Sequence, residues 1–331
     1  MPKNITEPQI LQDPHNGKER PWRVKKMRSN ALAYSFERLG QMKKAARVRD
    51  CGSVLTFSVN KETGERRLHD ANFCRERLCP MCAWRRSLKV FHEVSRVMSK
   101  AQADRPELVP LFLTLTLRNV TGDKLSETLD TVFNGWKRLG GNPGTRFRRI
   151  VLGWFRALEV TYNAKSDTFH PHIHAILLVD KGYFRRNSKD YTTTAEWVQM
   201  WRRALRLDYD PICNIQRVKG RKALNEVSKY TVKDTDYIRK DPILTDRLVN
   251  TLSLALKGRR LYAFGGVLKD VAKTLDAVEP DTGDLVTIDG ETVRPDVATL
   301  LLTYRWNFGF KNYILAKAGP GRGDPAPANG S

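Results

Sequence analysis

The 331-residue chain has few histidines, few cysteines and no long apolar run. No apolar stretch approaches the ~20 residues that a membrane span needs, and the polar first 22 residues do not resemble a signal peptide. We therefore expect a soluble, cytoplasmic protein without a membrane partner. The five cysteines are an odd number and four of them fall within residues 51–82, which argues against a secreted disulfide framework.

Acidic residues are also scarce, with 36 Asp and Glu against 58 Lys and Arg, a net charge of +22. Such an excess predicts a polyanionic partner. Seven Trp, ten Tyr and thirteen Phe are interleaved with the basic residues, and aromatic rings among cations suit base stacking as well as packing. The composition therefore favours a nucleic acid as the partner.

Composition and periodicity divide the chain into five segments. We expect a basic N-terminal arm and helix (1–50), a Cys-rich segment with a helix (51–105), a mixed segment (106–245), a C-terminal segment with an acidic excursion (246–318) and a disordered tail (319–331). Little periodicity is visible before residue 30, so the helix of the first segment is expected to be short.

The mixed segment alternates strand and helix patterns. Strands are expected at 111–117, about 150–162, 169–179 and 212–218, and helices at 125–139, 194–205 and 222–233. The polar turn 163–168 joins two of these strands into an antiparallel hairpin. The pattern predicts an α+β fold with a largely antiparallel central sheet flanked by helices.

Three of the six histidines, His170, His172 and His174, alternate at the start of one expected strand. Alternate residues of a strand share a face, so these imidazoles project together. They could lie on a solvated strand, but the Ala-Ile-Leu-Leu-Val that follows indicates a strand entering a core. Converging imidazoles favour a metal or phosphate site.

If the hairpin is centred on its turn, Glu159 lies directly opposite His172. A shift of one residue in the register would turn Glu159 to the other face. Glu159, His172 and His174 then form a site for a divalent ion that acts as a Lewis acid on a phosphoryl oxygen. His170 precedes Pro171 and is expected to bind phosphate or to support the site. The alternating Phe112, Thr114 and Thr116 are expected to border it.

The spacing Cys51-x22-Cys74-x4-Cys79-x2-Cys82 resembles a structural zinc site. Two thiolates two residues apart can bind one tetrahedral ion in a tight turn. His69 could replace Cys51 or Cys74 as a ligand, and free buried thiols are the alternative reading. The isolated Cys213 is expected in the core.

The expected helix 222–233 carries Glu226, Tyr230 and Lys233 on one face. A phenol near a cation or a metal-polarised phosphate can attack phosphorus, and a carboxylate beside it can activate water. The alternative is a solvated helix face without a catalytic role.

These motifs, in this order, resemble those of the rolling-circle replication initiators of small bacterial plasmids, members of the HUH endonuclease superfamily. The resemblance spans roughly residues 48–268. It is carried by the segments Asn72–Lys89, Phe112–Thr116, His170–His174, Glu226–Lys233 and Gly258–Gly266.

The resemblance implies an HUH-type sheet, ferredoxin- or RRM-like, and a site-specific single-strand DNA endonuclease and strand transferase. His172 and His174 would hold Mg²⁺ or Mn²⁺ against the scissile phosphate of a plasmid double-strand origin. Tyr230 would attack within a single-stranded segment and form a 5′-phosphotyrosyl intermediate, and Glu226 would activate water at termination. A host helicase and the replication machinery are the implied partners. Some members use paired tyrosines, which makes Tyr237 the alternative nucleophile.

Three other functions fit parts of the pattern. The His-x-His-x-His run also resembles histidine-triad nucleotide hydrolases, which lack a zinc knuckle. The cysteine cluster and the charge would suit a non-catalytic zinc-containing DNA- or RNA-binding regulator. A transposase or conjugative relaxase of the same superfamily would share the chemistry, but the cysteine segment and the pairing of Glu226 with Tyr230 favour replication.

Overall fold

The computed structural model describes residues 8–15, 17–141, 144–218, 232–277, 283–288 and 299–321. The chain divides into two compact units, and the first joins the two ends of the chain. The first unit comprises Met1–Arg85 and Asp284–Ser331, and the second comprises Arg86–Gly283. In the described part of the chain, no helix has both the length and the apolar character needed to cross a membrane.

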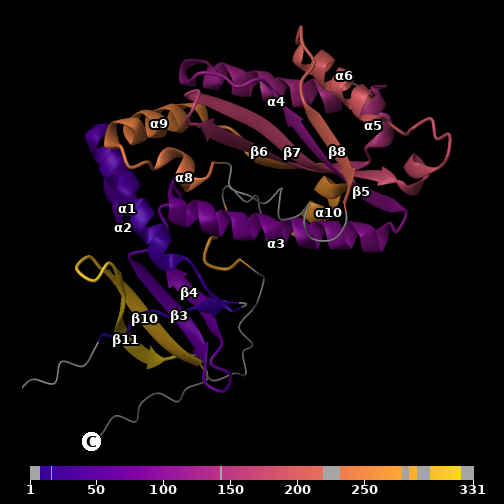
Figure 1. Ribbon diagram of the computed structural model, residues 1–331. Coiled ribbons are helices and arrows are strands. Elements are labelled where there is room, and N and C mark those ends of the chain that lie inside the picture. The colour runs from indigo at the N-terminus through magenta and orange to yellow at the C-terminus, as the bar shows by residue number, and fades with distance from the viewer. Residues whose placement is uncertain are drawn as a thin grey trace, which may run out of the picture. The chain divides into compact units, whose positions relative to one another are not determined.

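The first unit contains a four-stranded antiparallel sheet in the order β11-β10-β3-β4 (Figure 1). Its elements are the short pair β1 (Pro14–His15) and β2 (Lys18–Glu19), α1 (Trp22–Arg38), α2 (Met42–Asp50), β3 (Val54–Asn60), β4 (Arg66–Ala71), β10 (Thr299–Asn307) and β11 (Asn312–Pro320). The Trp22 ring lies 5.8 Å from that of Phe57, which lies 6.1 Å from that of Tyr304. These contacts join α1 to two strands that are far apart in the sequence.

The helix α1 begins at Trp22 and has 17 residues, so the first segment is already helical before residue 30, and α2 with 9 residues is the short helix that follows. The buried face of α1 includes the polar side chains of Lys26, Ser29 and Ser35, so the apolar period is interrupted. Lys26 is fully buried, and its Nζ donates to the carbonyl oxygens of Arg49 and Cys51 at 2.6 and 2.8 Å. A lysine satisfied by backbone carbonyls thus occupies a position where sequence patterns lead one to expect an apolar residue.

The second unit contains a five-stranded sheet in the order β8-β5-β7-β6-β9, with every neighbouring pair antiparallel. Its strands are β5 (Leu108–Thr116), β6 (Gly153–Asn163), β7 (Thr168–Asp180), β8 (Cys213–Arg217) and β9 (Tyr262–Gly266). Its helices are α4 (Leu125–Gly141), α5 (Arg146–Ile150), α6 (Thr194–Leu205), α8 (Asp234–Tyr237), α9 (Pro242–Ala255) and α10 (Val267–Thr274), with 3-10 turns η1 (Gly122–Lys124) and η2 (Lys181–Phe184). The helix α3 (Pro80–Asp104) belongs to this unit from Arg86 onward.

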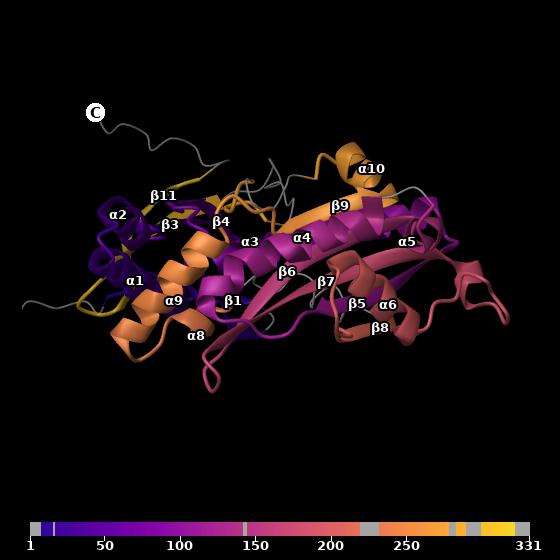
Figure 2. The same cartoon turned by 90° about the horizontal axis from the view of Figure 1, so that it is seen from above.

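Helices cover both faces of the five-stranded sheet. The helices α4 and α6 lie on one face and α3 on the other (Figures 1 and 2). On the α4 and α6 face, Trp136 and Trp154 have ring centroids 5.0 Å apart, and the Trp201 indole donates to the Thr116 carbonyl. The expected antiparallel sheet flanked by helices is therefore confirmed.

Several expected elements occur where the sequence placed them. The helix expected at 194–205 is α6, which begins with a capping box between Thr193 and Glu196. The expected helix 222–233 lies outside the described residues apart from its last two. The described residues include 283–288, which lie near the centre of the acidic excursion. The strand β11 extends to Pro320, two residues into the tail expected from 319 onward, because Leu300 on β10 pairs with Pro320.

Candidate functional site

The hairpin of β6 and β7 positions the candidate metal ligands. Glu159 pairs with His172 and Ala157 pairs with His174, which is the register expected from a hairpin centred on its turn. The strand β5 lies on the other side of β7, where Thr114 pairs with His174. The carboxylate and both imidazoles therefore share one face of the central strands.

The side chains of Glu159, His172 and His174 converge on one point. The Nε2 atoms of His172 and His174 lie 3.2 and 2.9 Å from the same oxygen, Oε2 of Glu159. Ligands at 2.0–2.1 Å on neighbouring corners of an octahedron are about 3 Å apart. All three residues are buried, and they form one of two groups in the described residues whose spacing suits a metal ion.

Hydrogen bonds to the other ring nitrogens orient the imidazoles. Nδ1 of His172 donates to the carbonyl oxygen of His170 at 3.1 Å, and Nδ1 of His174 lies 3.1 Å from the Thr114 hydroxyl. Nε2 of His172 is thereby turned toward the carboxylate of Glu159. Two electron-rich atoms at that distance need a cation or a proton between them, and outer hydrogen bonds of this kind commonly fix metal-binding histidines.

The charge state of Glu159 suits a cation. Burial opposes its ionisation, but the hydrogen bonds and charges of His172 and His174 outweigh burial and hold the pKa of this carboxyl well below its usual range. Lys233, half-exposed, lies with its Nζ 3.9 Å from Oε1 of Glu159. The site therefore contains an anionic carboxylate, Glu159, with the cationic Lys233 close to it.

Other side chains border this group. The ring of Phe112 stacks on His174 with centroids 5.5 Å apart, so the expected Phe and Thr face of β5 does border the site. His170 has its ring 5.2 Å from that of His172 but is not part of the converging group. Burial raises the pKa of Asp236, which senses the charges of Lys233 and Glu159. Sequence reasoning missed Asp236, although it lies only three residues after Lys233.

Two of the sequence-predicted catalytic residues, Tyr230 and Glu226, lie outside the described residues. The alternative nucleophile Tyr237 is the last residue of α8, and its side chain is only 1% exposed. A buried phenol of this kind is not accessible to a DNA phosphate.

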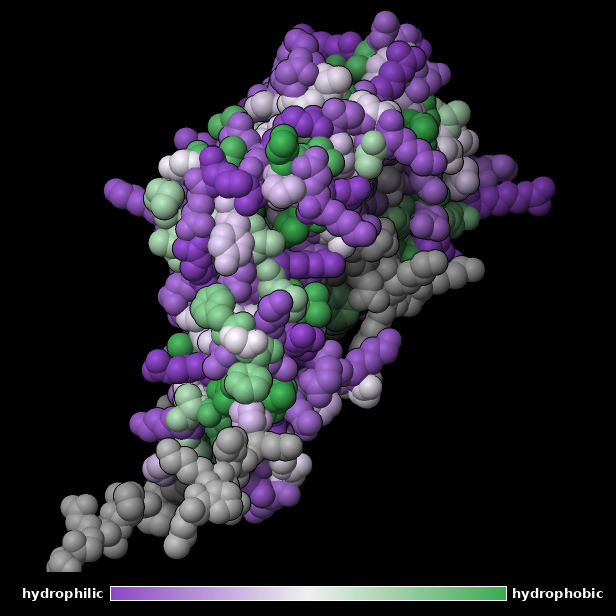
Figure 3. All heavy atoms as spheres, turned by 60° about the vertical axis from the view of Figure 1, so that its left-hand side comes forward, coloured by the Kyte–Doolittle hydropathy of each residue, from purple (hydrophilic) through white to green (hydrophobic). Residues whose placement is uncertain are grey.

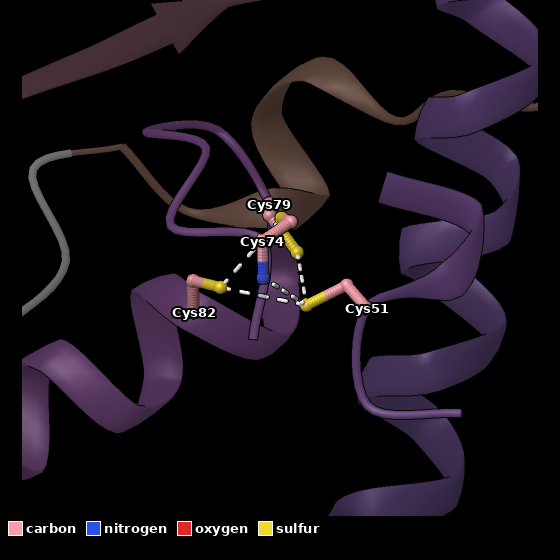
Figure 4. A group of neighbouring side chains, drawn as sticks. All are labelled: Cys51, Cys74, Cys79 and Cys82. Carbon is pink, nitrogen blue, oxygen red and sulfur yellow. Dashed lines mark hydrogen bonds between the residues drawn. The ribbon is translucent and has the colours of Figure 1, made fainter. Parts of the chain in front are cut away.

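The second group consists of the four cysteines of the first unit. Cys51 follows α2, Cys74 and Cys79 lie in the loop before α3, and Cys82 lies in its first turn. Figure 4 shows all four sulfur atoms pointing toward one another. Sγ of Cys51 lies 3.5 Å from those of Cys79 and Cys82, and Sγ of Cys74 lies 3.7 Å from that of Cys82.

These distances suit a tetrahedral ion better than a disulfide. A disulfide needs about 2.05 Å between sulfurs, whereas ligands 2.3 Å from the centre of a tetrahedron are about 3.8 Å apart. His69, the alternative ligand, lies on β4 with an exposed side chain and outside the group. The structure thus brings the four cysteines together and leaves His69 outside their group.

Hydrogen-bond donors surround the sulfurs, as thiolates require. The backbone N–H of Cys74 donates to Sγ of Cys51, and that of Arg75 donates to Sγ of Cys82, both at 3.3 Å. Burial opposes ionisation of Cys79, yet bonds from the other thiols and from Ser29 lower its pKa well below the usual range. Burial lowers the pKa of Lys26, and the nearby cysteines act in the opposite direction. Sequence reasoning missed Ser29 and Lys26 because both come from a distant helix.

Comparisons with known proteins agree with the resemblance carried by the motifs. The sequence model of a family described as replication protein matches residues 65–314. A protein named Protein rep from Bacillus amyloliquefaciens is 40% identical, over 92% of this chain and 97% of its own length. Another Protein rep, from Streptococcus pneumoniae serotype 2, is 34% identical over 96% of this chain and 99% of its own length.

A Replication protein from Staphylococcus aureus is 31% identical over 66% of this chain and 96% of its own length. No solved structure was found to match the chain. The family match includes Glu159, His172 and His174 together with three of the four clustered cysteines, Cys74, Cys79 and Cys82. The chain therefore belongs to the replication-protein family, and its resemblance to plasmid replication initiators is confirmed.

Proposed function

We propose that the protein is a rolling-circle initiator that nicks and rejoins one DNA strand at a plasmid double-strand origin. The observation that carries this proposal is the convergence of Glu159, His172 and His174 on one point, in a member of a replication-protein family. Two imidazoles and one carboxylate leave several coordination positions of a divalent ion for phosphate oxygens and water. The net charge of +22 suits a DNA substrate.

In the proposed reaction, the phenolic oxygen of Tyr230 forms a bond to the scissile phosphorus. The bond from phosphorus to the 3′ oxygen breaks, the phenol proton is released to solvent, and the departing oxygen takes up a proton from solvent and ends as a free 3′ hydroxyl. A bound Mg²⁺ or Mn²⁺ would supply Lewis-acid polarisation of the phosphate. Lys233 balances negative charge, and Glu226 activates the water that ends the cycle. The roles of Tyr230 and Glu226 rest on the sequence motif.

We also propose that Cys51, Cys74, Cys79 and Cys82 hold a structural Zn²⁺, as a zinc knuckle that ties α2 to the start of α3. Support comes from the sulfur spacing and from the backbone N–H groups aimed at the sulfurs. The HUH-type character of the five-stranded sheet, a cytoplasmic location, and a host helicase and replication machinery as partners belong to the same proposal.

The test is nicking of a supercoiled plasmid that carries the DNA flanking the coding sequence, with Mn²⁺ and with a chelator. Tyr230→Phe should abolish nicking, because no phenolic oxygen remains to attack. His172→Ala should slow nicking by about 100-fold or more, since Lewis-acid catalysis is worth several kcal/mol. Both variants should keep most of their duplex binding.

Tyr237→Phe is the matched control and should nick at the parental rate. Mass spectrometry of a trapped adduct should locate the nucleotide on Tyr230. An adduct on histidine, or continued nicking by Tyr230→Phe, would disprove the tyrosine mechanism. Nicking that persists in both chelator and His172→Ala would disprove the metal's role.

A further inference from the structure

Two aromatic side chains stand exposed at the turn between β10 and β11. Phe308 and Phe310 are each 59% exposed, and every residue from Asn307 to Lys311 is exposed. Large hydrophobic side chains usually leave water on folding, so two phenylalanines on one tight turn are costly unless something covers them. The family match extends to residue 314 and includes this turn.

The turn is held in place from both sides. The Asn307 side chain accepts from the backbone N–H of Phe310 at 3.0 Å, and Nε of Arg23 on α1 donates to the carbonyl oxygen of Lys311 at 2.9 Å. Directly below it, the buried rings of Trp306 and Tyr313 lie 5.1 Å apart. The two phenylalanines are thus presented on a preorganised hairpin, which reduces the entropy lost on binding.

The surroundings of the turn are basic. Arg305 precedes the turn on β10, Lys311 belongs to the turn, and Arg23 on α1 contacts it. All three cationic side chains are exposed. On the face drawn in Figure 3, hydrophilic side chains predominate and hydrophobic ones occur in small patches. Aromatic rings flanked by cations match a polymer of flat bases and phosphates better than an apolar protein surface.

We propose that the turn Phe308–Phe310 stacks on unpaired nucleobases of single-stranded DNA. This inference rests on the proposed function, because an initiator that cuts within a single-stranded segment must hold bases that have left the duplex. Aromatic side chains offer a stacking face to any base. Arg23, Arg305 and Lys311 then contact the adjoining phosphates.

The experiment measures fluorescence anisotropy of the full chain with labelled oligothymidine of about 30 nucleotides and with a duplex of similar length. Changing both phenylalanines to alanine should weaken oligothymidine binding by about tenfold or more, and duplex binding by less than about twofold. Tyrosine at both positions keeps the ring and should retain the affinity. Leucine at both positions keeps an apolar surface without a stacking face and should lose as much as alanine.

Parental oligothymidine affinity in the alanine variant would overturn the proposal. Parental affinity in the leucine variant would also overturn it and would indicate a general apolar contact. If the alanine variant lost self-association but bound DNA unchanged, the proposal would be overturned in the same way. The unfolding midpoint should not change, since both side chains are exposed. Nicking of a short single-stranded oligonucleotide by the parent is measured as a separate readout. If the parent does not nick but its oligothymidine binding depends on the two rings, only the proposed function is refuted.

Discussion

Cys213 and the four cysteines of the cluster carry the same thiol in two different environments. Cys213 lies on β8, and burial alone raises its pKa from 9.0 to about 12. Its thiolate, the reactive form, is therefore almost absent at pH 8. We expect iodoacetamide at pH 8 to leave Cys213 unmodified in the native protein. The cluster cysteines should become alkylated only after a chelator is added, as measured by peptide mass spectrometry.

The control is the same reaction in urea, where all five thiols should be modified. Cys213 labelled in the native state as fast as the chelated cluster would contradict its burial. The sign of the linkage follows from the raised pKa: protonated Cys213 stabilises the folded state below pH 9, and this stabilisation is lost as the pH rises toward 12.

At the scale of elements, Gly135 lets α4 approach α6. A Cβ at this position would lie 2.6 Å from Cδ2 of Leu205 and 3.2 Å from a ring carbon of Trp201. Gly135→Ala should therefore lower the free energy of unfolding by about 1–3 kcal/mol, the usual cost of overpacking. Urea denaturation followed by circular dichroism measures this loss.

Gly141→Ala in the same helix is the matched control, because its Cβ would meet nothing within 4 Å. It should leave stability unchanged or raise it slightly, since alanine favours the helix. Equal effects of the two substitutions would show that helix propensity, and not the approach of α4 to α6, determines the result.

Elements also show where sequence reasoning succeeds. The strands of a hairpin are joined by one local turn, so the centre of that turn predicts the register in which Glu159 pairs with His172. The pairing of β10 with β3, such as Thr303 with Thr56, joins segments almost 250 residues apart, and no local pattern indicates it. The start of α1 could not be predicted for a related reason. The buried Lys26 interrupts the apolar pattern, and its carbonyl partners at Arg49 and Cys51 lie outside this helix.

At the scale of the whole molecule, the C-terminal hairpin completes the unit that holds the cysteines. The fully buried Tyr313 on β11 donates its hydroxyl to the carbonyl oxygen of Gly52 at 2.6 Å, next to Cys51. Deleting residues 284–331 removes this bond and the burial of large side chains, worth about 1.5–3 kcal/mol each. We therefore expect zinc affinity at least about tenfold weaker, measured by competition with a colorimetric chelator.

Deleting only residues 322–331 is the matched control, since it leaves β10, β11 and Tyr313 in place, and it should keep the zinc affinity of the full chain. Tyr313→Phe isolates the hydroxyl and should lie between the two deletions, because it loses one hydrogen bond of about 1 kcal/mol but keeps the ring. If the longer deletion bound zinc as tightly as the full chain, the cysteine group would be a self-sufficient knuckle. The two ends of the chain would then be joined for a reason other than the metal.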